Sequence, residues 1–183
     1  MHIVALSGSP SASSRSTALL RHALARCAGA TSHTEILLRD LPAQALLRAD
    51  LGDPAVRAAR DQVLAARVVL VATPIYKAAY SGLLKTFLDL LPQDALRGRS
   101  VLALGTGGST AHLLALDYSL KPVLSALGAR HQLDAVYAVD AQLPPDGAGG
   151  YVVDPAISAR IDAALLDLPA ATAAPPRLLA AAA

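Results

Sequence analysis

Short apolar runs recur along the chain, and amphipathic stretches separate them. The runs have the length and composition of strands buried on both faces of a parallel sheet, and they occupy residues 3–6, 34–38, 68–72, 101–104 and 133–139. Between the runs, apolar residues return at helical spacing, as they do at Leu19, Leu20, Ala23 and Leu24. Strands that alternate with helices predict an α/β domain built on a parallel sheet.

Hydroxyl groups are concentrated directly after the first apolar run. A tight turn over Ser7–Pro10 leads into the first predicted helix, whose entry carries Ser11, Ser13, Ser14, Arg15, Ser16 and Thr17. A helix N-terminus offers unpaired N–H groups and a partial positive charge, and the hydroxyls and Arg15 add further donors. The segment therefore predicts a phosphate-binding loop. The alternative is a loop in which one hydroxyl only caps the helix. It is not a Walker loop, because no Gly-Lys-Ser/Thr follows.

Two more strand ends run into segments that are typical of ligand sites. Residues 73–81 join a strand directly to a helix, and we expect Pro74 to end that strand. Gly105–Thr110 holds three glycines, which let a backbone approach a flat ligand and present N–H groups to it. Ligands of open α/β sheets bind outside the carboxyl ends of the strands, so the three loops should meet at one crevice. For 73–81 alone, a connection that binds nothing is the alternative.

The early phosphate-type loop favours a flavodoxin-like fold, which is a doubly wound, five-stranded parallel sheet of order 2-1-3-4-5 with helices on both faces. That layout favours a mononucleotide, and FMN matches the three loops. Its phosphate would lie on Ser9–Thr17, and its ring between Thr73–Tyr76 and Gly105–Ser109. The candidate cofactor-binding residues are Ser9, Ser14, Arg15, Ser16, Thr17, Thr73, Pro74, Ile75, Tyr76, Lys77, Thr106, Gly107, Gly108 and Ser109.

The predicted helix over 110–127 is apolar on more than one side. Pro122 lacks an N–H group, so it should kink or bulge this helix between about residues 118 and 122. A helix that is apolar on two sides is either deeply buried or shared with another subunit. We favour the subunit interface.

Composition and charge narrow the function classes. The 183 residues fit one domain over 1–168, followed by an Ala/Pro-rich tail over 169–183 that we expect to be poorly ordered. The net charge is only +2 and the arginines are scattered, so neither a nucleic-acid nor a membrane partner is indicated. No histidine spacing suggests a metal site, and the lone Cys27 should be a buried structural thiol. The N-terminus lacks signal-peptide features, so we expect a cytoplasmic protein.

Several long motifs give the chain a family resemblance. They are Ser7-Gly-Ser-Pro10, Ser14-Arg-Ser16, Ala72–Lys85, Thr106-Gly-Gly108 and Ala111–Leu127. Over residues 1–140 the sequence resembles the NAD(P)H-dependent FMN reductases of the alkanesulfonate-utilisation type. The resemblance implies a flavodoxin-like homotetramer that transfers a hydride from NADPH or NADH to flavin N5. The reduced FMN would then serve a partner flavin-dependent monooxygenase in sulfur acquisition from organosulfonates.

The same resemblance assigns a role to Tyr118. In the family, an inserted tyrosine lies at a π-bulge on the subunit interface, close to the flavin, and Tyr118 occupies the matching position. It is the candidate catalytic residue, which would cover the flavin and control its release, with assembly through residues 110–128. Ser11 departs from the family pattern, because relatives often place an arginine there near the flavin phosphate. Arg15 is the candidate for supplying that charge.

Two other flavin-binding classes stay open at this point. A flavodoxin-type electron carrier would bind FMN without being an enzyme, although such carriers are usually acidic, with aromatic rings on both flavin faces. This chain is mildly basic and has no Trp. A quinone or azo-dye reductase could use the same scaffold. The choice between NADPH and NADH also stays open.

Overall fold

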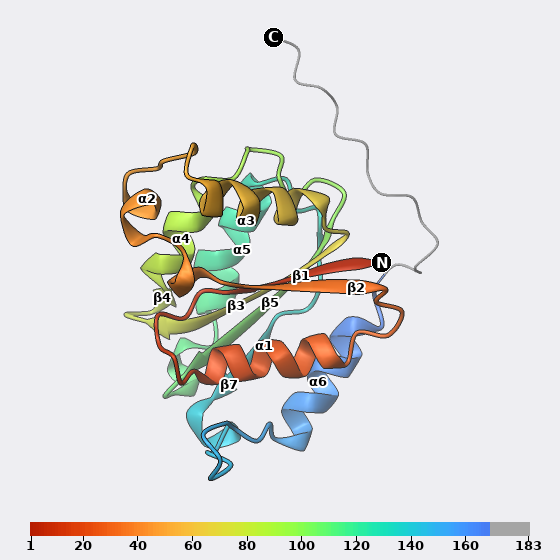
Figure 1. The fold of residues 1–183 in the computed structure, drawn as a ribbon. Helices are drawn as coiled ribbons and strands as arrows, with labels where there is room; N and C mark the ends of the chain where they lie inside the picture. Colours follow the sequence, from red (N-terminus) through yellow and green to blue (C-terminus); the bar gives the residue numbers. More distant parts are fainter. Residues whose placement is uncertain (169–183) are drawn as a thin grey trace.

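The computed structural model describes residues 1–168, so the tail expected over 169–183 lies outside the described residues. A twisted parallel sheet runs through the middle of the molecule (Figure 1). Its main strands are β1 (His2–Ser7), β2 (Ser32–Leu37), β3 (Val68–Tyr76) and β5 (Ser100–Gly107), paired in the order β2-β1-β3-β5. The strand predicted over 133–139 forms only as β7 (Val136–Val139), and a two-residue strand, β6 (His131–Gln132), precedes it; both pair with β5. The predicted flavodoxin-like order 2-1-3-4-5 is thus confirmed.

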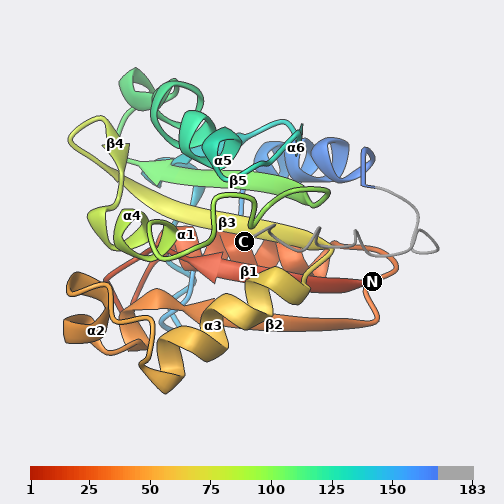
Figure 2. The same ribbon diagram turned by 90° about the horizontal axis from the view of Figure 1, so that it is seen from above.

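Helices cover both faces of the sheet (Figure 1, Figure 2). On one face lie α1 (Arg15–Ala25) and α6 (Pro155–Leu165). On the other lie α3 (Pro54–Ala65), α4 (Gly82–Leu88) and α5 (Lys121–Ala126). Asp53 caps α3 by accepting hydrogen bonds from the N–H groups of Ala55 and Val56.

A short helix, α2 (Ala43–Leu47), lies between β2 and α3. One helical turn is too short to produce a periodic pattern in the sequence. It forms because Ala45 and Leu46 are buried against the core.

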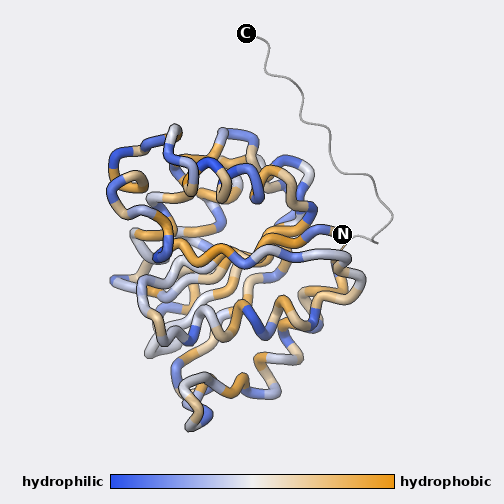
Figure 3. The backbone as a smooth tube through the Cα atoms, in the orientation of Figure 1, coloured by the Kyte–Doolittle hydropathy of each residue, from blue (hydrophilic) through white to orange (hydrophobic). Residues whose placement is uncertain are grey.

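The central strands β1, β3 and β5 are mostly apolar because they separate two cores. Along β1, Val4 and Leu6 face the core under α3 and α4, whereas Ile3 and Ala5 face the core under α1 and α6. This alternation follows from side chains pointing to opposite faces of a strand. The strands accordingly form the apolar middle layer of the molecule (Figure 3).

Two strands extend further than the sequence predicted. Pro74 does not end β3, which continues to Tyr76, and β5 continues through the first glycines to Gly107. The pairing of β1 with β3 stops at Ala72, so beyond that residue β3 has a parallel neighbour only on the β5 side. A proline is tolerated there, because it lacks only an N–H group that an edge does not need.

A hairpin continues β3 beyond the end of the parallel sheet. Its turn residues, Lys77 and Ala78, both have left-handed backbone conformations, with φ of 50° and 63°. Two such residues in succession form the tight turn that suits a two-residue hairpin. The chain then returns as β4 (Ala79–Tyr80), antiparallel to β3.

The segment over 110–127 is bulged, as Pro122 predicted. A 3₁₀ turn over Thr110–His112 and a π-helical turn over Leu116–Leu120 precede α5, in whose first turn Pro122 lies. A proline at that position needs no N–H partner. The buried side of the segment carries Leu116, Leu120 and Leu124, whereas Leu113, Leu114 and Tyr118 are exposed.

Cys27 is buried as predicted, and burial raises the pKa of its thiol to about 11. Within residues 1–168, every helix is too short or too polar to cross a membrane. The same part of the chain holds no group of three His, Cys, Asp or Glu side chains that could bind a metal ion.

Candidate functional site

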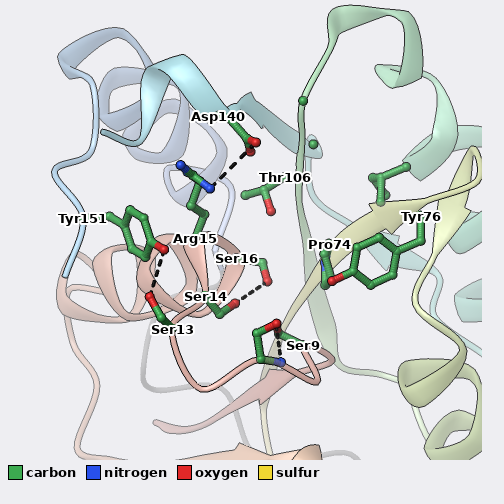
Figure 4. Close-up of a pocket in the computed structure, with 14 residues that line it drawn as sticks. Ser9, Ser13, Ser14, Arg15, Ser16, Pro74, Tyr76, Thr106, Asp140 and Tyr151 are labelled. Carbon is green, nitrogen blue, oxygen red and sulfur yellow. Dashed lines mark hydrogen bonds and ion pairs between the residues drawn. The ribbon is translucent and has the colours of Figure 1, made fainter. Parts of the chain in front are cut away.

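A pocket of about 210 Å³ opens where the carboxyl ends of β1, β3 and β5 meet. Parallel strands end at the same edge of the sheet, so the segments that follow them are brought together there. Figure 4 shows the pocket between the entry of α1 on one side and the ends of β3 and β5 on the other. It is lined by Ser9, Ser11, Ser13, Ser14, Arg15, Ser16, Pro74, Ile75, Tyr76, Thr106, Gly107, Gly108, Asp140 and Tyr151.

The loop after β1 is tied to the rest of the sheet by its backbone. The N–H group of Gly8 donates to the carbonyl of Ala72 at 2.7 Å. A Cβ atom at Gly8 would lie 2.7 Å from the Cβ atom of Leu84, so only glycine fits here. The hydroxyl of Ser81, which caps α4, donates to the Gly8 carbonyl. These bonds hold the first loop at the floor of the pocket.

The entry of α1 presents hydroxyls and backbone donors. Ser14 caps the helix, because its hydroxyl accepts a hydrogen bond from the N–H group of Thr17 at 3.2 Å. The hydroxyls of Ser14 and Ser16 lie 3.0 Å apart. The buried Ser9 hydroxyl accepts from the N–H group of Ser11 and faces the same space (Figure 4). A helix N-terminus surrounded by hydroxyls binds an anionic group such as a phosphate.

Residues that follow β7 hold Arg15 in place. Its Nε donates to the carbonyl of Leu143 at 3.1 Å, and its guanidinium lies 5.0 Å from the ring centroid of Tyr151. One of its terminal nitrogens lies 3.7 Å from a carboxylate oxygen of Asp140. The Tyr151 hydroxyl is in turn 2.9 Å from that of Ser13.

The opposite wall is backbone and flat side chains. Pro74, Ile75 and the half-exposed Tyr76 come from the end of β3, and Thr106 and Gly107 from the end of β5. This wall suits a planar ligand, because it offers flat groups and an edge of backbone rather than long side chains.

Two adjacent glycines shape this wall for different reasons. A Cβ atom at Gly107 would lie 2.4 Å from the hydroxyl of Tyr137, which donates to the carbonyl of Ser109 at 2.7 Å. Burial raises the pKa of Tyr137, with a smaller contribution from the nearby Asp140. At Gly108, by contrast, the nearest atom to an added Cβ is Asp140 Oδ2 at 4.0 Å. A side chain at position 108 would project into the open space of the pocket. Because Gly108 has no side chain, a ligand has room to approach the backbone there.

Comparison with known proteins agrees with this geometry. The sequence model described as NADPH-dependent FMN reductase matches residues 1–143. This chain belongs to that family. The match confirms the family expected from the sequence. It also confirms the enzyme class, an oxidoreductase that uses FMN and a nicotinamide nucleotide.

The matches between this FMN reductase and individual relatives span most of the length of both chains. The chain is 48% identical to an FMN reductase (NADPH) of Escherichia coli K12 over 146 residues, which are 78% of this chain and 75% of the relative. It is 36% identical to the NADH-dependent FMN reductase SfnE of Pseudomonas putida, over 78% of this chain and 79% of the relative. The solved apo form of an NADH:FMN oxidoreductase, EMOB, superposes with a TM-score of 0.82 at 43% identity, covering 92% of this chain and 90% of that one.

The structure brings ten of the residues predicted to bind the cofactor to the pocket of this FMN reductase. They are Ser9, Ser14, Arg15, Ser16, Pro74, Ile75, Tyr76, Thr106, Gly107 and Gly108. Their position agrees with the expected site, and their contacts with a cofactor remain predictions.

Four other predicted cofactor residues lie just outside the pocket lining. The buried Thr17 hydroxyl is 2.8 Å from that of Ser7, and the Thr73 hydroxyl accepts from the N–H group of Ser81 at 2.9 Å. Ser109 caps the 3₁₀ turn, and Lys77 lies in the hairpin turn. The side chains of Thr17, Thr73 and Ser109 brace the loops in this structure, and the cofactor contacts predicted for all four residues stay predictions.

Tyr118 lies on the π-helical turn, with 79% of its surface exposed, and does not line the pocket of its own chain. Its predicted role at the flavin therefore requires either a movement or a neighbouring subunit.

Two pocket residues were missed by the sequence reasoning. Asp140 directly follows the last strand, so the rule that ligands bind beyond the carboxyl ends of strands could have included it. Tyr151 carries no such signal, because it lies eleven positions further on in an irregular segment. Only the folded chain places it against Arg15.

Proposed function

We propose that this FMN reductase binds FMN with its phosphate at the entry of α1 and its ring against the ends of β3 and β5. One observation carries the proposal. A hydroxyl-rich helix N-terminus and a backbone edge without side chains at Gly107 and Gly108 open onto the same pocket. The first fits a phosphate and the second a flat ring system.

Each wall of the pocket has a distinct task in this proposal. Ser9, Ser14 and Ser16 donate hydroxyl hydrogen bonds to the phosphate, and the N-terminal N–H groups of α1 add their partial positive charge. Pro74 and Tyr76 present flat surfaces beside the ring. The N–H groups near Gly108 face the part of the ring that becomes more electron-rich on reduction.

The chemistry itself is that of the bound groups. Bound FMN would supply the hydride acceptor and the nicotinamide nucleotide the hydride, so the residues of the chain supply binding and orientation. The chain needs no general acid or base for this step. Its residues have to keep both ring systems in register and leave one flavin face accessible.

We further propose that the reduced flavin leaves as a product and serves a flavin-dependent monooxygenase. The resemblance to the alkanesulfonate-utilisation type supports this role. The relatives include both an NADPH-dependent and an NADH-dependent FMN reductase, so either nucleotide is a candidate donor. Both nucleotides and the proposed monooxygenase partner favour the cytoplasm as the site of action.

We also propose the homotetramer that the resemblance implies, assembled through residues 110–128. Leu113, Leu114 and Tyr118 form an exposed apolar patch on the segment that precedes α5, which we call the 113–118 patch. Exposed apolar residues gathered on one segment are typical of an interaction surface. In such an assembly Tyr118 would approach the flavin site of another subunit, which accounts for its distance from its own pocket.

Oxidation of NADPH and NADH, followed at 340 nm with the purified protein, tests the proposal. We expect oxidation to require added FMN, and to rise with FMN concentration well beyond one equivalent if the flavin is a substrate. Saturation at one equivalent would instead identify a tightly held prosthetic group. Oxidation of neither nucleotide in the presence of FMN would contradict the proposed activity.

A further inference from the structure

The pocket holds a single pair of opposite charges. Of the described residues that line it, Arg15 is the one cation and Asp140 the one anion. Both lie at the end of the pocket that holds the N-terminus of α1, where the phosphate is proposed to bind. The anion is the unexpected member, because a carboxylate repels a phosphate.

The orientation of Arg15 makes the carboxylate relevant to binding. The guanidinium extends toward Asp140 rather than toward Ser9 (Figure 4). The hydrogen bond from Arg15 Nε to the Leu143 carbonyl and the stacking on Tyr151 hold it on that side. Arg15 thus contacts residues of the 140–151 segment, and its guanidinium does not point toward the serines at the entry of α1.

The contact between the two charges is weak enough to be exchanged. The 3.7 Å separation is longer than an N–H···O hydrogen bond, and both side chains keep a third to a half of their surface in solvent. A phosphate monoester carries about −1.5 to −2 charges at neutral pH and accepts bidentate bonds from a guanidinium. A bound phosphate could therefore recruit Arg15, but only in competition with Asp140.

We propose that Asp140 selects against the flavin phosphate by competing with it for Arg15. This inference rests on the proposed function, since it takes the α1 entry as the phosphate site. Asp140 lowers the affinity for FMN without affecting riboflavin, which has the same ring and sugar chain but no phosphate. The weaker hold on FMN suits a flavin that enters and leaves in each turnover.

Affinities for FMN and riboflavin in Asp140 variants provide the test. Asp140→Asn keeps the shape of the side chain, and Asp140→Ala removes the charge without adding a donor. We expect either change to lower the Kd for FMN by about three- to tenfold, and to leave the Kd for riboflavin unchanged. Quenching of flavin fluorescence gives both constants. Asp61→Asn is the matched control, because Asp61 is exposed on α3, on the other face of the sheet.

A double-mutant cycle assigns the effect to the named pair. In an Arg15→Gln background, Asp140→Asn should change the Kd for FMN much less than it does in the wild-type protein. An undiminished effect would mean that Asp140 acts without Arg15, and would overturn the proposed competition.

Other results of the binding measurements distinguish a failure of this inference from a failure of the proposed function. If both flavins bind more weakly to the Asp140 variants, Asp140 is a ligand of the shared part of the flavin and the inference is wrong. An unchanged ratio of the two affinities would also overturn it. Failure of the wild-type protein to bind either flavin would overturn the proposed function itself.

Discussion

Gly107 and Gly108 are adjacent, yet the structure requires glycine at the two positions for opposite reasons. Behind Gly107 stands a buried tyrosine whose hydroxyl lies 2.4 Å from the position of a Cβ atom. In front of Gly108 lies the open pocket. Substitutions at the two positions should therefore separate the stability of the fold from the affinity for flavin.

Gly107→Ala should destabilise the protein by about 1–3 kcal/mol, because the new methyl group displaces the Tyr137 hydroxyl and weakens its bond to Ser109. Gly108→Ala should leave stability almost unchanged and raise the Kd for FMN, because its methyl group occupies space needed by the ligand. Urea unfolding and flavin titration measure the two effects. Equal stability losses in both variants would contradict the assignment.

A second change tests the cause of the instability. Tyr137→Phe removes the hydroxyl that the Gly107→Ala methyl group would meet. The double variant should therefore recover part of the stability lost in Gly107→Ala. Strictly additive losses would show that the clash with Tyr137 is not the cause.

At the scale of single residues, the sequence identified those that lie close together along the chain. The serines around Arg15 and the glycines after β5 could be found because their clustering is itself the signal. Asp140 and Tyr151 reach the same pocket from 125 to 136 positions further along the chain than Arg15. The position of Asp140 at the end of β7 could have placed it at this edge of the sheet, but the sequence alone does not show that Asp140 and Tyr151 contact Arg15.

Among the elements, α1 and α6 share an apolar core and are joined by polar contacts as well. The guanidinium of Arg26 donates hydrogen bonds to the carboxylate of Asp162, and a ring nitrogen of His22 forms a hydrogen bond with the hydroxyl of Ser158. Burial lowers the pKa of His22, and the nearby Arg26 lowers it further, although Asp162 acts in the opposite direction. The native state therefore favours the neutral ring.

This shift predicts a pH dependence of stability. The pKa of His22 is lower in the folded chain than its ordinary value of about 6.5, so the unfolded chain binds a proton first as the pH falls. The free energy of unfolding should be highest above about pH 7 and decline as the pH drops through that value toward the lower folded pKa. His22→Gln should show a shallower decline than the wild-type protein in urea titrations from pH 7.5 to 5. Parallel curves would contradict the role of His22.

Asp162 changes its protonation at lower pH than His22, so it does not contribute to the pH dependence measured between pH 7.5 and 5. The hydrogen bond from Arg26 lowers the pKa of its carboxyl. A carboxyl with a lowered pKa loses its stabilising effect only when the pH falls below its ordinary value of about 3.9. The two groups therefore titrate in separate ranges.

The order of the elements could be predicted more reliably than their ends. Continuous apolar runs identified the strands because both faces of the sheet are buried. The ends of β3 and β5 were wrong because pairing, rather than local preference, decides where a strand stops. The Pro122 bulge was predictable because a missing N–H group acts locally.

At the scale of the whole molecule, the pocket and the 113–118 patch are separate surfaces. They are connected through β5 and the β3–β4 hairpin, which contact the segment that carries the patch. Leu116 packs against Gly105, where a Cβ atom would lie 3.0 Å from its side chain. β4 lies beside the π-helical turn, and its partner strand β3 carries Tyr76 into the pocket. The backbone that carries the patch is thereby packed against the strands that line the site.

The 113–118 patch should hold the assembly together, and a charge placed in it should dissociate the protein. Leu114, with 55% of its surface exposed, is the site to change, because Leu114→Arg would bury a cation in an apolar interface but cost little in an isolated subunit. Sedimentation velocity should show the wild-type protein as an oligomer and this variant as a smaller species whose far-ultraviolet circular dichroism spectrum shows that the subunit is still folded. Leu47→Arg, at a leucine exposed to 77% on α2, is the matched control and should keep the wild-type size. If the Leu114→Arg variant also kept that size, assembly would have to proceed through another face. Tyr118 would then have no neighbouring flavin to approach.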